Sequence, residues 1–129
     1  MPTRQALPER LHPSGSLTGR VAEAGQRVVY EVAGDLEHAS ADALARRLAT
    51  LADGTVGDIH LDVSRVAFVD SVGLQVLIRL HRRLREERRR LVLCDPAPPL
   101  SRLLELTLLD RSLVVRTHRD GAASHPTSS

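Results

Sequence analysis

Two periodicities of apolar residues alternate along this chain, and this alternation restricts its fold more than any other feature. Ile59, Leu61 and Val63 are separated by single polar residues, which is the two-residue period of a strand with one buried face. Between Ser40 and Gly54 the apolar residues instead recur every three or four positions, the period of an amphipathic helix. Strands and helices that alternate in this way predict an α/β domain with a mixed, mostly parallel sheet.

The whole pattern predicts the order strand, strand, helix, strand, helix, strand, helix, strand, with four to five strands packed against helices. Ser40 is expected to cap the first helix, and the first two strands are expected to form a hairpin. The predicted strands are 17–21, 28–32, 59–63, 91–94 and 113–115. The first predicted helix starts after Ser40, the second runs from Gly73 to about Arg90, and the third begins at the prolines before Leu100.

The composition of the two ends differs from that of the middle. Residues 1–16 are rich in proline and polar side chains, and residues 119–129 contain almost no large apolar side chain, so we expect two disordered tails around one domain at 17–118. The single cysteine, Cys94, excludes an internal disulfide and fits a reducing compartment. Neither a signal peptide nor a run of roughly 18 apolar residues is found, so the expected location is cytoplasmic, without a membrane.

The charge pattern does not favour nucleic-acid binding. Eighteen basic residues, all arginine, are balanced by sixteen acids, and Tyr30 and Phe68 are the only aromatic residues available for base stacking. The arginines between positions 79 and 90 alternate with Glu86 and Glu87, and we expect i,i+4 ion pairs of Arg82 and Arg90 with Glu86, and of Arg83 with Glu87, on a solvated helix face.

The most informative stretch is 66–74, where the chain leaves a strand and enters a helix. A serine at a helix N-terminus lies beside backbone N–H groups without helical partners, and the helix dipole there favours negative charge. Ser71 therefore occupies a position that can hold a phosphate. The alternative is that Asp70 or Ser71 only caps the helix, although neither completes a capping box, because Gly73 and Leu74 follow three residues later.

A hydrolase that uses Ser71 as its nucleophile is a further alternative. The nucleophile elbow requires the pattern G-x-S-x-G, and Val69 stands in the first glycine position. The histidines His38, His60 and His81 are scattered, without metal-ligand spacing, and no glycine-rich nucleotide signature is present. We therefore expect no enzyme activity, no cofactor and no metal.

Over residues 28–116 the sequence resembles a STAS domain of the anti-sigma factor antagonist type. The Asp-Ser-x-Gly-Leu sequence at 70–74, set between a strand and a helix, carries most of the resemblance. The segments 32–37, 61–66 and 99–104 also match the family's pattern. The resemblance implies the STAS fold and a cytoplasmic switch in a bacterial stress response that regulates transcription and catalyses nothing itself.

In such a switch the unphosphorylated antagonist binds a serine-kinase anti-sigma factor and so frees the sigma factor. The kinase then uses ATP to phosphorylate the serine that matches Ser71, and a metal-dependent serine phosphatase resets it. The resemblance implies that this phosphoprotein binds its partner through Gly34, Asp35, Leu36, Glu37, His38, Asp70, Ser71, Val72, Gly73 and Leu74.

Three positions depart from the family's pattern. Val72 replaces a frequent Ser or Thr, Glu37 replaces the usual Asp, and Leu108 replaces a frequent Gly at the end of the third helix. The alternative within the same fold is a scaffold, or a module that regulates a membrane transporter, in which Ser71 is never phosphorylated.

Overall fold

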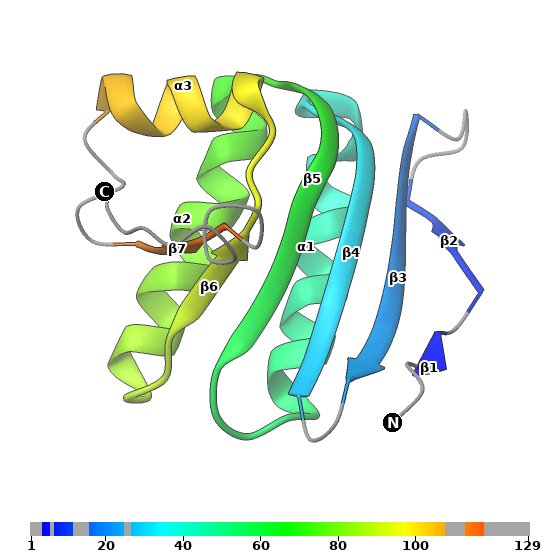
Figure 1. Ribbon diagram of the computed structural model, residues 1–129, viewed down its shortest axis with the longest axis vertical. Coiled ribbons are helices and arrows are strands. Elements are labelled where there is room, and N and C mark those ends of the chain that lie inside the picture. Colours follow the sequence, from blue (N-terminus) through cyan, green and yellow to red (C-terminus); the bar gives the residue numbers. More distant parts are fainter. Residues whose placement is uncertain (1–3, 6, 12–15, 25–26, 108–112, 118–129) are drawn as a thin grey trace.

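The computed structural model describes residues 4–5, 7–11, 16–24, 27–107 and 113–117. Within these ranges seven strands form one sheet in the order β1-β3-β4-β5-β6-β7, and β2 pairs with β3 beside β1 (Figure 1). Helices α1 and α2 lie side by side behind the sheet, and α3 crosses the end of the sheet above β6 and β7. No helix in the described ranges is long and apolar enough to cross a bilayer.

The elements confirm the predicted order over the central part of the chain. β3 and β4 form the predicted antiparallel hairpin, and the pairs β4–β5, β5–β6 and β6–β7 are parallel. The strands are β1 (Arg4–Gln5), β2 (Glu9–Arg10), β3 (Leu17–Ala24), β4 (Arg27–Leu36), β5 (Ile59–Val69), β6 (Leu91–Cys94) and β7 (Val114–Arg116), and the helices are α1 (His38–Asp53), α2 (Ser71–Glu86) and α3 (Pro98–Thr107).

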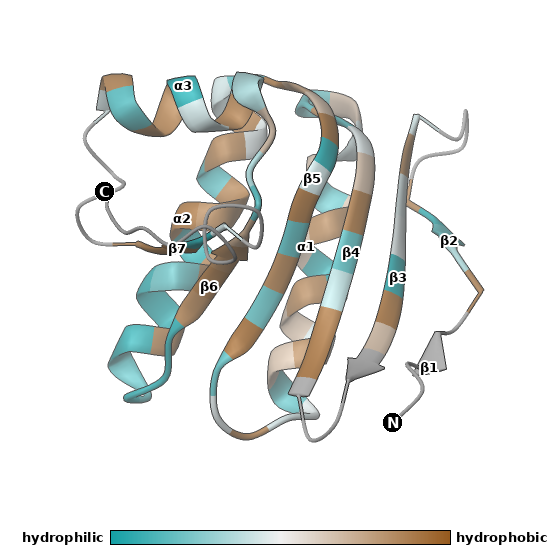
Figure 2. Cartoon of the chain, viewed as in Figure 1, coloured by the Kyte–Doolittle hydropathy of each residue, from teal (hydrophilic) through white to brown (hydrophobic). Residues whose placement is uncertain are grey.

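The core between the sheet and the helices is almost entirely aliphatic. Leu48 of α1, Leu77 of α2 and Leu61 of β5 are each at most 1% exposed, and Tyr30 is the one fully buried aromatic side chain among the described residues. Burial of one such leucine stabilises the fold by about 1.5–3 kcal/mol. The second half of α2 is mostly hydrophilic, whereas β6 is hydrophobic throughout (Figure 2).

The structure departs from the expected disorder of residues 1–16. β1 and β2 pair antiparallel with β3, and Leu11, which follows β2, is only 8% exposed. The physical reason is that β3 would otherwise be an edge strand with unpaired N–H and C=O groups, which the N-terminal segment satisfies. Residues 118–129, including the predicted C-terminal tail, lie outside the described residues.

The first helix begins earlier than predicted, because Ser40 is not its cap. α1 starts at His38, and the extended residue Glu37 is the N-cap. Ser40 is fully buried, and its hydroxyl accepts the Glu37 N–H at 3.2 Å and donates to the Asp35 carbonyl at 2.8 Å. Ser40 therefore stabilises the approach to the helix from inside its first turn.

The second helix ends earlier than predicted. The sequence pattern extends from Gly73 to about Arg90, but α2 spans Ser71–Glu86. Arg88 has a φ of 60°, and the N–H of Arg89 turns back to the carbonyl of Leu84 at 2.7 Å. A left-handed residue followed by such a bond is a common helix stop that is usually built on glycine, so an arginine there gives no sequence signal.

Candidate functional site

Asp70 joins the N-termini of two helices. It lies between β5 and α2 as the N-cap of α2, and its Oδ1 accepts the N–H of Gly73 at 2.8 Å. Its Oδ2 accepts the N–H of His38, the first residue of α1, at 3.0 Å. These donors favour the charged carboxylate, so the pKa of Asp70 is lowered, chiefly by the Gly73 N–H. The carboxylate thereby fixes the two helix starts relative to each other.

Ser71 is the first residue of α2 and its side chain is exposed. Its hydroxyl makes no hydrogen bond to any residue within the described ranges. The capping role therefore belongs to Asp70, which decides between the two predicted caps. The Ser71 hydroxyl remains accessible at a helix N-terminus, where negative charge is favoured.

Gly73 allows α2 to pack directly against the end of β4. A Cβ atom at this position would lie 2.7 Å from the carbonyl carbon of Leu36 and nearer still to its oxygen. The same oxygen accepts the Asp70 N–H at 3.1 Å. This backbone contact brings the two predicted segments, 34–38 and 70–74, together.

Gly34 opens the first of these segments with a backbone that favours glycine. Its φ is 114°, and a Cβ atom would collide with the carbonyl of Ser16. The next N–H, that of Asp35, donates to this Ser16 carbonyl at 2.7 Å. The end of β4 is therefore held between the residue before β3 and the start of α2.

The ten predicted partner-binding residues divide by exposure. Leu36, Gly73 and Leu74 are buried and can only support the surface. Two of the three departures from the family's pattern belong to this set. Glu37 is half-buried as the cap of α1, and Val72 is 41% exposed beside Ser71. Leu108, another predicted departure, lies outside the described residues. The accessible part of the site consists of His38, Ser71 and Val72, with half-buried Gly34, Asp35, Glu37 and Asp70.

A groove between α1 and α2 begins at Ser71, and the sequence did not reveal it. It has a volume of about 370 Å³, and two of the α1 side chains that line it, Ala41 and Ala45, are small. The alanine spacing of four residues was the available signal, but alone it does not show which element faces it. The other lining residues are Asp42, Ser71, Val72, Gln75, Val76 and Arg79.

Arg83, Arg89 and Arg90 pair with acidic groups of the same chain, whereas the predicted ion pair of Arg82 with Glu86 does not form within the described ranges. Arg83 and Glu87 form the predicted i,i+4 ion pair at 3.1 Å. Arg90 lies beyond the helix and pairs with Asp58 at 2.9 Å, and not with Glu86 as predicted, because the chain has already turned away.

Among the residues that the structure describes, no histidine completes a catalytic group around Ser71. No described histidine ring forms a hydrogen bond with Ser71, and His81 is buried with neither ring nitrogen bonded. Burial lowers the pKa of His81, with the nearby Arg85 and Arg82 acting in the same direction. No group of three His, Cys, Asp or Glu side chains that could hold a metal occurs within the described ranges.

Comparisons with known proteins agree with this geometry. A family model described as "Mlab, STAS domain" matches residues 20–116. A protein of Bordetella bronchiseptica that carries the name anti-sigma factor antagonist BtrV is 29% identical over 91 residues, which are 70% of this chain and 78% of that protein. The crystal structure of an anti-sigma factor antagonist from Mycobacterium paratuberculosis has a TM-score of 0.72 at 25% identity and covers 84% of this chain and 93% of its own. SpoIIAA, an anti-sigma factor antagonist solved in its unphosphorylated form, shares the fold with a TM-score of 0.63 at 22% identity over 81% of this chain and 92% of its own.

Proposed function

Because this chain belongs to the STAS domain family, we propose that it is an anti-sigma factor antagonist switched by phosphorylation of Ser71. The observation that carries the proposal is the exposed, unbonded Ser71 hydroxyl at the first residue of α2, directly after the cap Asp70. The relatives named anti-sigma factor antagonists support it. In this proposal the domain catalyses nothing and acts only through its partners.

The unphosphorylated protein binds a serine-kinase anti-sigma factor, which then releases its sigma factor. The kinase transfers the γ-phosphoryl group of ATP to the Ser71 oxygen, and a serine phosphatase hydrolyses the phosphoserine and restores the binding form. A phosphate adds about −1.5 to −2 charges at neutral pH. The N–H groups at the start of α2 accommodate this charge, so the domain stays folded while its surface changes.

The added charge lies next to the Asp70 carboxylate, which is ionised at neutral pH, and the lowered pKa of this group keeps it ionised to lower pH as well. A partner surface that fits a neutral hydroxyl then faces two adjacent anionic groups. Like charges opposed across an interface, or charges left unpaired in it, weaken binding. The switch therefore works through charge at one surface and needs no large conformational change.

The groove beside Ser71 extends the proposed partner surface along α1 and α2. Its small floor residues leave room for an apolar side chain of the partner, and Asp42 and Arg79 stand at its rim. The substitution Ala45→Leu fills the groove with little loss of helix propensity, and we expect it to weaken kinase binding at least about tenfold. Ala49→Leu, one turn further along α1 and outside the groove, is the matched control and should bind normally. Equal affinities of the two variants would remove the groove from the partner surface.

Mapping the phosphate tests the proposed function itself. The protein is incubated with ATP and a purified serine-kinase anti-sigma factor from the same organism, and the modified residue is identified by mass spectrometry. We expect one phosphate on the wild type and on the control Ser101→Ala, and none on Ser71→Ala. Phosphate on Ser64 or Ser101 would overturn the proposal. Absence of any phosphate, together with binding that Ser71→Asp does not affect, would favour the scaffold or transporter-regulating alternative.

A further inference from the structure

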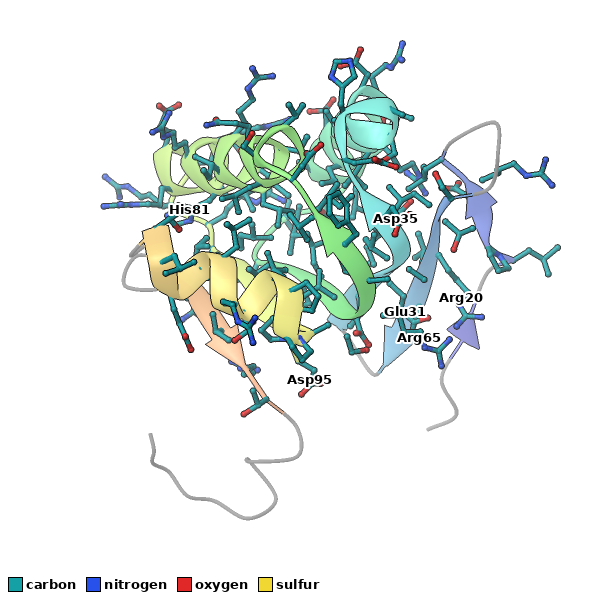
Figure 3. The ribbon with its side chains drawn as sticks, turned by 90° about the horizontal axis from the view of Figure 1, so that it is seen from above. Arg20, Glu31, Asp35, Arg65, His81 and Asp95 are labelled. Carbon is teal, nitrogen blue, oxygen red and sulfur yellow. The ribbon has the colours of Figure 1, made fainter. Side chains whose placement is uncertain are left out.

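A polar cleft lies on the face of the sheet opposite α1 and α2. It has a volume of about 240 Å³ and is formed by neighbouring positions of β3, β4 and β5, with Pro8 of the N-terminal segment as one wall. Arg20, Glu31 and Arg65 stand on this side of the sheet, away from the two helices (Figure 3). The cleft is thus formed by different residues from those of the Ser71 surface.

A β-bulge in β5 brings an arginine into this cleft. Glu31 of β4 pairs with Asp62 of β5, but two residues later Ala33 pairs with Arg65 and not with Ser64. The extra residue in β5 exchanges a serine for an arginine beside Ala33. Bulges often redirect a side chain next to a functional site, and here the redirected group is a guanidinium.

The other charged groups of the cleft are already bound within the protein. Glu31 accepts hydrogen bonds from Nε and Nη2 of Arg20, at 2.8 and 2.6 Å. Asp62 accepts hydrogen bonds from the backbone N–H and the hydroxyl of Ser64, at 3.0 and 2.7 Å. Arg65, by contrast, forms no ion pair or hydrogen bond with any residue in the described part of the chain. Arg65 is therefore the charged group of the cleft whose hydrogen-bonding capacity is unused, although the charges of Arg20, Arg65, Glu31 and Asp62 sum to zero.

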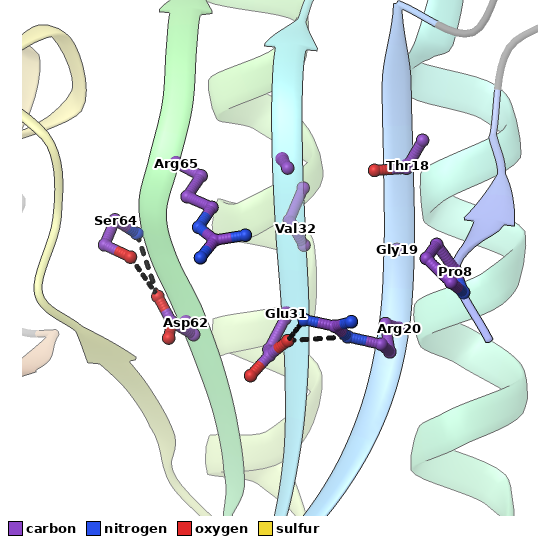
Figure 4. A pocket seen from close by; sticks show the side chains of 10 residues that line it. Pro8, Thr18, Gly19, Arg20, Glu31, Val32, Asp62, Ser64 and Arg65 are labelled. Carbon is purple, nitrogen blue, oxygen red and sulfur yellow. Dashed lines mark hydrogen bonds and ion pairs between the residues drawn. The ribbon is translucent and has the colours of Figure 1, made fainter. Parts of the chain in front are cut away.

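A second donor faces Arg65 across the cleft. Thr18 of β3 and Arg65 of β5 are both register partners of Ala33 in β4. A hydroxyl, a methyl group and a guanidinium therefore lie in line across the three strands. The two side chains point toward β4 from opposite sides (Figure 4). Their backbones are about 10 Å apart across three strands, which leaves room over the alanine for a group that accepts a hydrogen bond from each side.

We propose that this cleft binds the carboxylate or phosphate group of a small organic anion. The Arg65 guanidinium pairs with the oxyanion through its planar N–H donors, the Thr18 hydroxyl donates from the other side, and the Ala33 methyl forms the floor. Asp62 and Glu31 limit the site to one anionic group, because a second would approach their carboxylates.

The experiment titrates the full-length protein with sodium phosphate and, separately, sodium acetate, at constant ionic strength, and follows backbone amide shifts by NMR. We expect saturable shifts at residues 18, 33 and 65, with at least about tenfold weaker binding for Arg65→Gln. Ala33→Leu should also abolish binding, because its side chain fills the space above β4. The matched control Arg102→Gln removes an equally exposed arginine on α3 and should leave binding unchanged.

Saturation by phosphate alone identifies a phosphate ligand, and saturation by both anions identifies a site that also takes carboxylates. Equal weakening by Arg65→Gln and Arg102→Gln would overturn the site, since it would indicate unspecific attraction to a basic surface. Shifts that never saturate up to about 50 mM of either anion, at fixed screening, would overturn it as well. Circular dichroism and the urea midpoint establish that each variant is folded.

Discussion

Replacing Gly73 with alanine measures how closely α2 must approach β4. The new Cβ atom would lie 2.7 Å from the Leu36 carbonyl carbon and nearer to its oxygen. The oxygen also accepts the Asp70 N–H at 3.1 Å, so it belongs to a fixed backbone contact and cannot rotate away. The start of α2 would have to shift by roughly 1 Å to regain ordinary van der Waals contact.

Two effects on the free energy of unfolding oppose each other in this variant. Alanine is favoured over glycine in a helix by about 1 kcal/mol. Overpacking costs about 1–3 kcal/mol, and loss of the hydrogen bond between Asp70 and Leu36 costs about 1 kcal/mol more. We therefore expect the free energy of unfolding of Gly73→Ala to fall by about 1–3 kcal/mol.

Urea denaturation followed by circular dichroism measures this change. With a denaturant slope of about 1–3 kcal/mol per molar, the midpoint should fall by about 1 M. Gly54→Ala is the matched control, because its Cβ would lie 3.5 Å from the Thr50 carbonyl oxygen, an ordinary contact, and its φ is −92°. The control should keep the wild-type midpoint or exceed it. A Gly73→Ala variant as stable as Gly54→Ala would refute the close approach of α2 to β4.

Three further predictions concern contacts elsewhere in the fold. Asp70→Ala removes a carboxylate whose pKa is lowered by helix N–H groups. The wild type should therefore be more stable than the variant above the ordinary aspartate pKa of about 4, and this advantage should disappear as the pH falls through the lower pKa of the folded state. Urea midpoints of both proteins, measured from neutral to acidic pH, test this pH dependence. Glu9→Ala removes a carboxylate that accepts a hydrogen bond from the Tyr30 hydroxyl at 3.1 Å. Burial and Glu9 both raise the pKa of Tyr30, so this pKa should fall in the variant when the single tyrosine is titrated and followed by ultraviolet absorbance. An unchanged pKa would contradict the contact. Arg89→Ala leaves three backbone carbonyls at and beyond the end of α1 without their donor, so the free energy of unfolding measured with urea should fall by about 1–3 kcal/mol. The control Arg82→Ala, at an exposed position, should change it by no more than about 0.5 kcal/mol, and equal losses in the two variants would argue against this role of Arg89.

Local sequence patterns were sufficient to predict the central elements and the placement of Ser71 at the start of a helix. Periods or short runs of apolar residues predicted β3 to β7 and the three helices, because most of these elements bury apolar side chains in the same core. The Asp70 side chain could be predicted as a cap because its role depends on residues within one turn. Its second bond, to the His38 N–H of α1, could not, because it depends on how the two helices meet.

The N-terminal strands could not be predicted for the same reason. β1 and β2 contain only two residues each, and their stability comes from the free edge of β3. Glu9 adds side-chain contacts, since it accepts the Tyr30 hydroxyl and pairs with Arg47 at 2.7 Å. If residues 1–16 were a disordered tail, trimming the chain to about 10–119 would leave its stability unchanged. The contacts of Glu9 instead predict a loss of thermal stability on that truncation.

The groove and the cleft also depend on packing that no local pattern records. Ala41 and Ala45 form a hollow only because α2 lies beside them. Arg65 reaches the cleft face only because β5 contains a bulge, since uninterrupted alternation from Asp62 would have placed Ser64 on that face and Arg65 on the opposite one. These features follow from the relative position of elements, and so they require the structure.

The most direct test of the Ser71 switch is the affinity of the serine-kinase anti-sigma factor for the phosphorylated and unphosphorylated protein, measured by calorimetry. A phosphate about 6 Å from one partner carboxylate is repelled by about 5 kcal/mol at an effective dielectric constant near 20, and screening reduces this to roughly 2–4 kcal/mol. Since each 1.4 kcal/mol is a factor of ten, the Kd should rise about thirty- to several-hundred-fold on phosphorylation. Ser71→Ala should bind as tightly as the unphosphorylated wild type, and Ser71→Asp should show part of the loss. Equal affinity of the two phosphorylation states would contradict the switch.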